Sequence, residues 1–278
     1  MRVSTATLSL CSLLLLASVT ANFALFSYAK QYYKEANATR LDPTGTNYYS
    51  STVLPKDSSN KLRVVFLGDS RAKAWPNPKQ DSTNIRSKHY QFINRGISSQ
   101  TSSQVLQRFA AHVVPLKPDV IVLQVGINDL KTIALFPERA WSIQQDYKAN
   151  IAQLVMQSQK TADVVIISTI LPAGKISLAR RPFWSADVDA AVVEANLYLK
   201  QLVEETRTKD RDDALTRENQ QRADIIFFDG FSVVAGENGK MNASYQLDEL
   251  HMNPAGYNAL NQDLLLHLEE TAARLMPP

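Results

Sequence analysis

The sequence predicts an α/β fold of three layers, in which a five-stranded parallel sheet lies between two layers of helices. Short apolar runs, several of them rich in β-branched residues, alternate with longer segments that have helical apolar spacing. Such runs are typical of parallel strands, because both faces of these strands are covered. The apolar runs also lead into glycine, proline or polar side chains, and open α/β sheets bind their ligands at these strand ends.

The composition is that of an ordinary globular protein. The 278 residues are 45% hydrophobic and 21% charged, and the formal net charge is only +3. Because there is no long basic run, nucleic acid is not an expected partner. The single cysteine, Cys11, lies in the N-terminal apolar segment, so we expect no disulfide in the folded part.

The first 30 residues are predicted to be a membrane anchor or a signal peptide. No charged residue occurs from Leu8 to Ala29, and a helix of this length would reach roughly 33 Å, enough to cross a bilayer core. The small residues Val19-Thr20-Ala21 also allow a cleaved signal peptide. We favour the uncleaved anchor and expect an extracytoplasmic, membrane-anchored protein. Secretion, or release into a periplasm after cleavage, is the alternative.

Residues 31–60 are predicted to be a tether, because turn residues are frequent there and no apolar period is sustained. Residues 61–278 are then the folded domain. The strands expected in it are Val64–Leu67, Tyr90–Asn94, Val120–Val125, Val164–Ile170 and Ile225–Phe228. The helices expected in it are Ser103–Val114, Trp141–Gln159, Asp187–Thr206 and Ala255–Leu275. The charge-rich stretch Thr206–Arg222 is expected to be a solvated helical extension or a loop. We expect the strand order 2-1-3-4-5, as in flavodoxin-like sheets.

The first strand runs directly into Gly68-Asp69-Ser70. This places Ser70 outside the carboxyl end of the strand, near the start of an expected helix, where free N–H groups favour developing negative charge. Taken alone, three turn residues in a row are more simply interpreted as a capped turn. Ser70 becomes a candidate nucleophile only in combination with the motifs that follow.

Three other segments carry polar residues where strands end. Asn94-Arg95-Gly96 ends the second strand, Gly126-Ile127-Asn128-Asp129 follows the third, and Asp248 to His251 precede the last helix. With Gly68-Asp69-Ser70 these four blocks, in this order, resemble the SGNH hydrolases, also called the GDSL family of esterases and lipases. The resemblance spans about residues 62 to 275. It is far more specific than any one block, because four separate turns would otherwise have to imitate the family in sequence.

The residues also make chemical sense without the family. A serine that cleaves esters needs a base within hydrogen-bond reach and a third group that orients the base. We expect Ser70 to be the nucleophile, His251 the base, and Asp248 the group that orients it. Asp248-x-x-His251 alone would more simply be interpreted as a helix cap. No Gly-x-Ser-x-Gly motif occurs, which argues against an α/β-hydrolase.

The resemblance implies an oxyanion hole made of three donors: the backbone N–H of Ser70, the backbone N–H of Gly96 and the side-chain amide of Asn128. Such donors stabilise the charged oxygen of a tetrahedral intermediate. Glycine at position 96 is compatible with close approach of the backbone to substrate. Without the family, Asn128 would be interpreted as a turn residue.

The chain departs from the family at Arg71, where Leu or Ile is frequent. Lys73, Arg95, Arg180 and Arg181 add positive charge near the strand ends. They indicate an anionic substrate or a lipid-facing flap, although solvated loop charges are the simpler interpretation.

The predicted function is therefore hydrolysis of a carboxylic ester of a lipid or an acylated glycan, through an acyl-serine intermediate. No cofactor is expected, and no metal, because the histidines show no ligand spacing. Two alternatives remain. In the first, the protein is an acyltransferase that passes the acyl group to a sugar or lipid hydroxyl. In the second, it is a non-catalytic, membrane-tethered binding protein with the same fold.

Overall fold

The computed structural model describes residues 4–49, 61–78, 90–216 and 223–276. The chain divides into two compact units, residues 1–47 and residues 48–278. Part of the loop expected between the first two strands lies outside the described residues, as do the end of the tether and the end of the charge-rich stretch.

The first unit is built on one long helix, α1 (Thr5–Leu41), whose start is capped by Ser4, which accepts the N–H of Thr7 at 3.2 Å. The helix continues past Lys30 into the segment expected to be a tether and ends at Leu41, with Asp42 as its C-cap before Pro43. Residues 31–41 contain no glycine or proline, and the residue before a proline disfavours helix. None of the α1 side chains is buried. Among the described helices, α1 is long enough to cross a membrane and contains an apolar stretch that could do so, although a signal sequence shares these properties.

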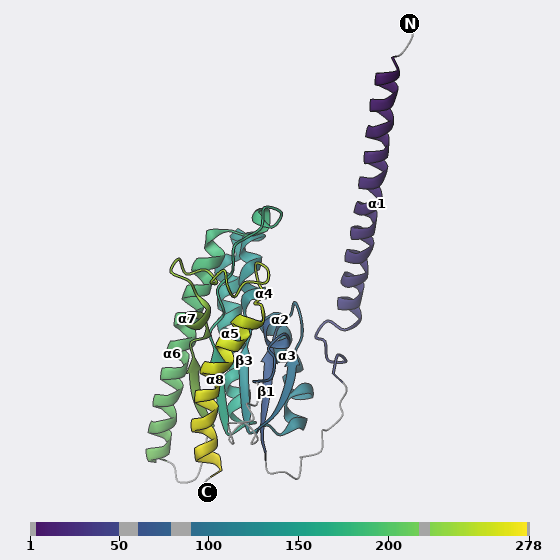
Figure 1. Cartoon of the computed structure of the whole chain (residues 1–278). Helices are drawn as coiled ribbons and strands as arrows, with labels where there is room; N and C mark the ends of the chain where they lie inside the picture. Colours follow the sequence, from purple (N-terminus) through teal and green to yellow (C-terminus); the bar gives the residue numbers. More distant parts are fainter. Residues whose placement is uncertain (1–3, 50–60, 79–89, 217–222, 277–278) are drawn as a thin grey trace. The chain divides into compact units, whose positions relative to one another are not determined.

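The second unit contains the predicted five-stranded parallel sheet, and its order β2-β1-β3-β4-β5 confirms the expected 2-1-3-4-5 (Figure 1). The strands are β1 (Leu62–Gly68), β2 (Tyr90–Gly96), β3 (Val120–Gln124), β4 (Val164–Ser168) and β5 (Asp224–Phe228). Every residue of β1 is buried, because β2 and β3 flank it and helices cover both of its faces.

Each strand leads into a helical segment before the next strand or the chain end. The α-helices of this unit are α2 (Ser70–Lys73), α3 (Ser102–His112), α4 (Ile127–Leu130), α5 (Ala140–Gln159), α6 (Ala186–Thr216), α7 (Gly230–Val234) and α8 (Pro254–Leu275). Single 3₁₀ turns are η2 (Val114–Leu116), η3 (Lys131–Ala134), η4 (Pro137–Arg139) and η5 (Arg181–Phe183). Helix α6 takes in the charge-rich stretch as far as Thr216, so that part is the helical extension.

The two faces of the sheet belong to two separate apolar clusters. Leu67, Leu123 and Ile167 face the cluster that holds the buried side chains of α3, α5 and α6. Phe66 and Val122 face the other cluster, which α7 and α8 complete. The alternation along the strands, with period two, distributes most of their apolar side chains between these clusters and produces the three layers. Val65 of β1 and Ile93 of β2 form a third, small cluster with Leu116.

At the end of β1, Gly68 is packed so tightly against β3 that no larger residue fits there. A Cβ atom at Gly68 would lie 1.8 Å from the carbonyl oxygen of Gln124 on β3. Gly68 therefore lets β1 remain beside β3 up to its last residue, and the chain turns immediately afterwards. This turn places Asp69 and Ser70 at the carboxyl edge of the sheet.

Candidate active site

Ser70 is the first residue of α2, and Asp69 is its N-cap. Asp69 adopts an extended conformation, and its Oδ1 accepts the N–H of Arg71 at 2.8 Å. Asp69 is fully buried, and burial raises the pKa of its carboxyl group while the charge of Arg71 opposes that rise. The N–H of Ser70 has no intrahelical acceptor, as expected at a first helical position, and makes no hydrogen bond within the described part of the chain.

The predicted acid–base pair lies on a tight loop, residues 246–253, which leads into α8. Asp248 Oδ1 accepts the backbone N–H of Leu250 at 2.8 Å and that of His251 at 2.7 Å. At the end of the loop, Asn253 caps α8 by accepting the N–H groups of Ala255 and Gly256. These bonds hold the Asp248 carboxylate directly beside the His251 ring.

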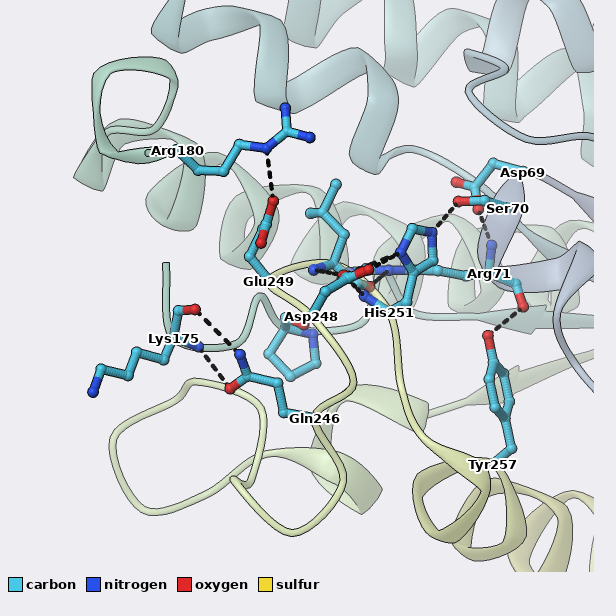
Figure 2. A network of polar contacts seen from close by, with 12 residues as sticks. Asp69, Ser70, Arg71, Lys175, Arg180, Gln246, Asp248, Glu249, His251 and Tyr257 are labelled. Atoms are coloured by element: carbon cyan, nitrogen blue, oxygen red, sulfur yellow. Dashed lines mark hydrogen bonds and ion pairs between the residues drawn. The ribbon is translucent and has the colours of Figure 1, made fainter. Parts of the chain in front are cut away.

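The structure brings the three predicted catalytic side chains together (Figure 2). His251 Nε2 lies 2.9 Å from Ser70 Oγ, and His251 Nδ1 lies 2.8 Å from Asp248 Oδ2. Because an ionised carboxylate can only accept, His251 Nδ1 must carry a proton, and in a neutral imidazole Nε2 would then present its lone pair to the serine hydroxyl. This is the geometry that a serine needs for transferring its proton to a base.

Asp248 is held in its charged form. Partial burial opposes ionisation, but hydrogen bonds from the backbone of Leu250 and His251 and from the His251 ring outweigh burial and lower the pKa of Asp248. In serine–histidine–aspartate sites, a carboxylate that stays charged orients the imidazole and stabilises the imidazolium of the protonated base.

Asn128 lies on α4, directly after β3, with its side chain almost fully buried. Its amide nitrogen donates one hydrogen to the carbonyl oxygen of Gln100 at 3.0 Å, and in the described residues the other hydrogen has no acceptor. The Gln100 side chain accepts from Arg108, which also donates to the carbonyl oxygen of Gly68. The amide is thus fixed in place and retains one hydrogen for a ligand.

Gly96 lies at the end of β2, opposite Gly68, but its N–H is already engaged: it donates to Asn94 Oδ1 at 2.8 Å. A Cβ atom at Gly96 would lie 2.1 Å from the backbone nitrogen of Lys73. Glycine at this position is therefore explained by packing of β2 against α2, whereas the sequence suggested close approach to substrate.

Ser99 is a residue that sequence reasoning missed. It adopts a left-handed backbone conformation, with φ of 65°, and it is exposed in the loop just before Gln100. Its N–H makes no hydrogen bond to any described residue. Since Gln100 contacts Asn128, this N–H lies on a loop attached to the Asn128 amide. Only the structure shows this backbone conformation, because a serine in a sequence does not indicate a positive φ.

Asp129, the neighbour of Asn128, accepts the N–H and the hydroxyl of Ser102 at the start of α3. Burial raises the pKa of Asp129 to about 6, although these hydrogen bonds oppose the rise. Because the folded-state pKa exceeds the unfolded value near 3.9, the folded protein binds more protons between these two pH values. Stability therefore falls as the pH rises through that window.

Asp129→Asn is expected to remove this dependence on pH. Relative to the parent, the variant should gain about 2 kcal/mol in free energy of unfolding between pH 4 and pH 7, on top of an offset that does not depend on pH. Urea unfolding of both proteins across this range measures the difference. Parallel stability curves for the two proteins would show that Asp129 titrates normally.

Most of the positive charges noted in the sequence have partners. Lys73 Nζ lies 2.7 Å from the hydroxyl of Tyr48, and the Arg95 guanidinium stacks 4.6 Å from the Tyr49 ring centroid. Tyr49 also donates to the carbonyl oxygen of Gly96 at 2.6 Å. Arg180 Nε lies 3.0 Å from the carboxylate of Glu249 on the loop 246–253 (Figure 2). These contacts favour structural roles for Lys73, Arg95 and Arg180.

A comparison with protein families finds a match over residues 66–259 to the GDSL-like lipase/acylhydrolase family. The matched region includes all five residues predicted for the catalytic site and the oxyanion hole. No curated protein matches this chain.

Several solved structures share the fold. A candidate acylhydrolase from Bacteroides fragilis NCTC 9343 is 26% identical, with a TM-score of 0.59, and the match covers 80% of this chain and 93% of that one. A GDSL-like lipase from Bacteroides thetaiotaomicron VPI-5482 is 22% identical over 82% of this chain and 98% of its own, with a TM-score of 0.59. An acetylxylan esterase from Geobacillus stearothermophilus is 18% identical over 76% and 96%, with a TM-score of 0.53.

Proposed function

The chain belongs to the GDSL-like lipase/acylhydrolase family of ester-hydrolysing enzymes, and we propose that it is a serine esterase which works through an acyl-Ser70 intermediate. The observation that carries this proposal is the continuous chain of hydrogen bonds from Ser70 Oγ through His251 to Asp248. The match to the family supports the chemistry, and the geometry supports the roles of these residues.

In the first half of the reaction, Ser70 Oγ attacks the ester carbonyl carbon while its proton moves to His251 Nε2. The carbonyl oxygen becomes an oxyanion, and Asp248 stabilises the imidazolium. The carbon–oxygen bond to the alcohol then breaks, and the alcohol leaves with the proton from His251 Nε2. The acyl group stays on Ser70.

In the second half, a water molecule attacks the acyl carbon and His251 Nε2 takes its proton. The second tetrahedral intermediate collapses, Ser70 Oγ recovers the proton from His251, and the acid product leaves. Both halves use the same base and the same donors to the oxyanion, so one arrangement of side chains serves the whole cycle.

For the oxyanion we propose the N–H of Ser70 and the free hydrogen of the Asn128 amide, with a third donor from the loop after β2. Gly96 is the donor expected from the family resemblance. The hydrogen bond from Gly96 to Asn94 favours Ser99 for this role, because the Ser99 N–H is not engaged by any described group. Donors fixed before the reaction stabilise the charged oxygen most.

The substrate that we propose is a carboxylic ester of a lipid or an acylated glycan. Turnover of a panel of chromogenic esters, from acetyl to long acyl chains, tests the activity and defines the acyl length. Repeating the assay with an added sugar or lipid alcohol separates the two enzyme classes: a hydrolase releases the free acid, whereas an acyltransferase yields a new ester. A protein that turns over none of these esters, and binds a ligand without cleaving it, would be the binding protein.

We propose an extracytoplasmic, membrane-anchored location, supported by the length and apolar character of α1. The full-length protein is expected to sediment with membranes. A shortened protein that begins at Tyr48 should be soluble and keep its turnover of short esters. Sedimentation and an ester assay measure both properties. Mature protein that begins at Asn22 and is free in solution would identify a cleaved signal peptide instead.

The start of the shortened protein matters, because Tyr48 and Tyr49 contact Lys73, Arg95 and Gly96. A second shortened protein that begins at Asn60 lacks both tyrosines and serves as the matched comparison. It should also be soluble, but with a lower melting temperature. Equal melting temperatures for the two proteins would mean that these contacts contribute nothing to stability.

A further inference from the structure

The residue after the nucleophile, Arg71, is a fully buried cation. Its guanidinium donates to three backbone carbonyl oxygens: Nε to Leu250 at 2.8 Å, Nη1 to Leu171 at 2.6 Å and Nη2 to Pro172 at 3.3 Å. Burial lowers the pKa of Arg71, but arginine does not lose its proton in proteins, so the charge is permanent. The side chain thus connects α2 to the loop after β4 and to the loop 246–253, called the catalytic loop from here on.

A buried charge of this kind is costly, and stability alone does not account for it. Hydrogen bonds to neutral carbonyls and the charge of the buried Asp69 carboxyl offset only part of the cost of removing a guanidinium from water, and well-packed apolar residues often serve stability as well or better. Leu or Ile, which are frequent here in the family that this sequence resembles, would fill much of the same space. The arginine therefore calls for a role that an apolar side chain cannot perform.

The contact with Leu250 indicates that role. Leu250 directly precedes His251, and it lies on the loop that also holds Asp248. In the described structure, two hydrogen bonds join residues 69–73 to the loop 246–253: Ser70 to His251, and Arg71 to Leu250. The first is the bond that must change during catalysis, so the second is the one that can hold the two segments together throughout the cycle.

We propose that Arg71 is a positioning residue, whose guanidinium holds the Leu250 carbonyl and so keeps His251 Nε2 within reach of Ser70 Oγ. This inference deepens the proposed function and rests on it for its effect on catalysis. Tyr257 on α8 supports the same arrangement, because its hydroxyl donates to the backbone carbonyl of Arg71 at 3.0 Å (Figure 2). The bonds to Leu171 and Pro172 prevent the guanidinium from following the catalytic loop if that loop moves.

Replacement of Arg71 by leucine removes the bond to Leu250 but keeps the site apolar and filled. Turnover should fall about ten- to hundredfold with little change in KM, because a small misplacement of a reacting group costs up to about a hundredfold. Arg71→Lys keeps the charge and can reach one carbonyl, so its turnover should lie between those of the parent and Arg71→Leu.

Arg63 provides a matched control, because it is a second buried arginine and lies on β1, the strand that leads into α2. It lies near the amino end of β1, is 4% exposed, and donates through its guanidinium to the carbonyl oxygen of Leu116 and to Gln91. Arg63→Leu therefore removes another buried guanidinium, at the end of β1 opposite to Ser70. It should change the melting temperature while leaving turnover near that of the parent.

The decisive measurement is the Ser70 Oγ to His251 Nε2 distance in crystal structures of Arg71→Leu and Arg63→Leu. It should exceed hydrogen-bond reach, about 3.5 Å, in the first variant and remain short in the second. A short distance and parental turnover in Arg71→Leu would overturn the inference, as would equal losses of turnover in both variants. If Arg71→Leu does not fold, the same two criteria apply to Arg71→Met, whose unbranched side chain also has no hydrogen-bond donor. The distance is independent of ester cleavage, so a parent protein without esterase activity would reject the proposed function alone.

Discussion

Replacing Ser70 with alanine should leave a folded protein whose ester turnover is lower by about 10⁴ to 10⁶. The alanine removes the atom that attacks the substrate, and neither His251 nor Asp248 can form the acyl intermediate without it. Folding should survive, because the Ser70 hydroxyl is bonded within the described structure only to His251 Nε2. Steady-state turnover of an activated ester measures the loss, and thermal melting checks the fold.

Ser70→Ala must be compared with the activity of the expression host, because traces of other esterases set the lowest rate that can be assigned to this protein. A preparation from cells that carry no copy of the gene, purified in the same way, provides that baseline. Parental turnover in a well-folded Ser70→Ala protein would remove the mechanism entirely.

Asn128→Ala is expected to cost roughly 10²- to 10³-fold in turnover, which corresponds to about 2.7 to 4 kcal/mol of transition-state stabilisation. The free hydrogen of its amide interacts most strongly with the substrate oxygen once that oxygen is charged. The loss should therefore appear in kcat much more than in KM. Asn128→Asp should be at least as damaging despite its similar size, because a carboxylate repels the oxyanion.

A second asparagine separates this effect from a loss of structure. Asn196 on α6 is partly buried and bonds both the N–H and the carbonyl of Ile170, just after β4. Asn196→Ala should lower the melting temperature and keep most of the turnover. Near-parental turnover in both Asn128 variants, with parental melting, would exclude Asn128 from the oxyanion hole and restore its interpretation as a turn residue.

The fold could be predicted because the physical signals are local. Apolar runs such as Val164–Ile167 are buried on both faces, and α5 and α8 show helical spacing, so sheet and layers follow from pattern alone. The extent of α1 was less predictable. Residues 31–41 have no apolar period, because α1 buries no side chains. The helix continues there because no glycine or proline interrupts it.

The proximity of the three candidate catalytic side chains, Ser70, Asp248 and His251, was predictable because they follow a strand or precede a helix, where an ordered set of polar residues is conspicuous. The neighbouring residues and contacts that surround these side chains could not be predicted. Three such features depend on how distant segments pack together. They are the buried position of Arg71, the hydrogen bond from Gly96 to Asn94 and the left-handed conformation of Ser99. In the sequence, Arg71 stood out only as a departure from the family. The sequence also did not indicate that Lys73 and Arg95 contact Tyr48 and Tyr49.

The most direct test of the central claim is the site of covalent labelling by a fluorophosphonate, which reacts with an activated serine. After incubation, digestion and mass spectrometry, the label should be found on the peptide that contains Ser70. Labelling should be absent in Ser70→Ala and strongly slowed in His251→Ala, because the base that activates the hydroxyl is then missing. Failure of the parent protein to react, or a label on any other residue, would contradict Ser70 as the nucleophile.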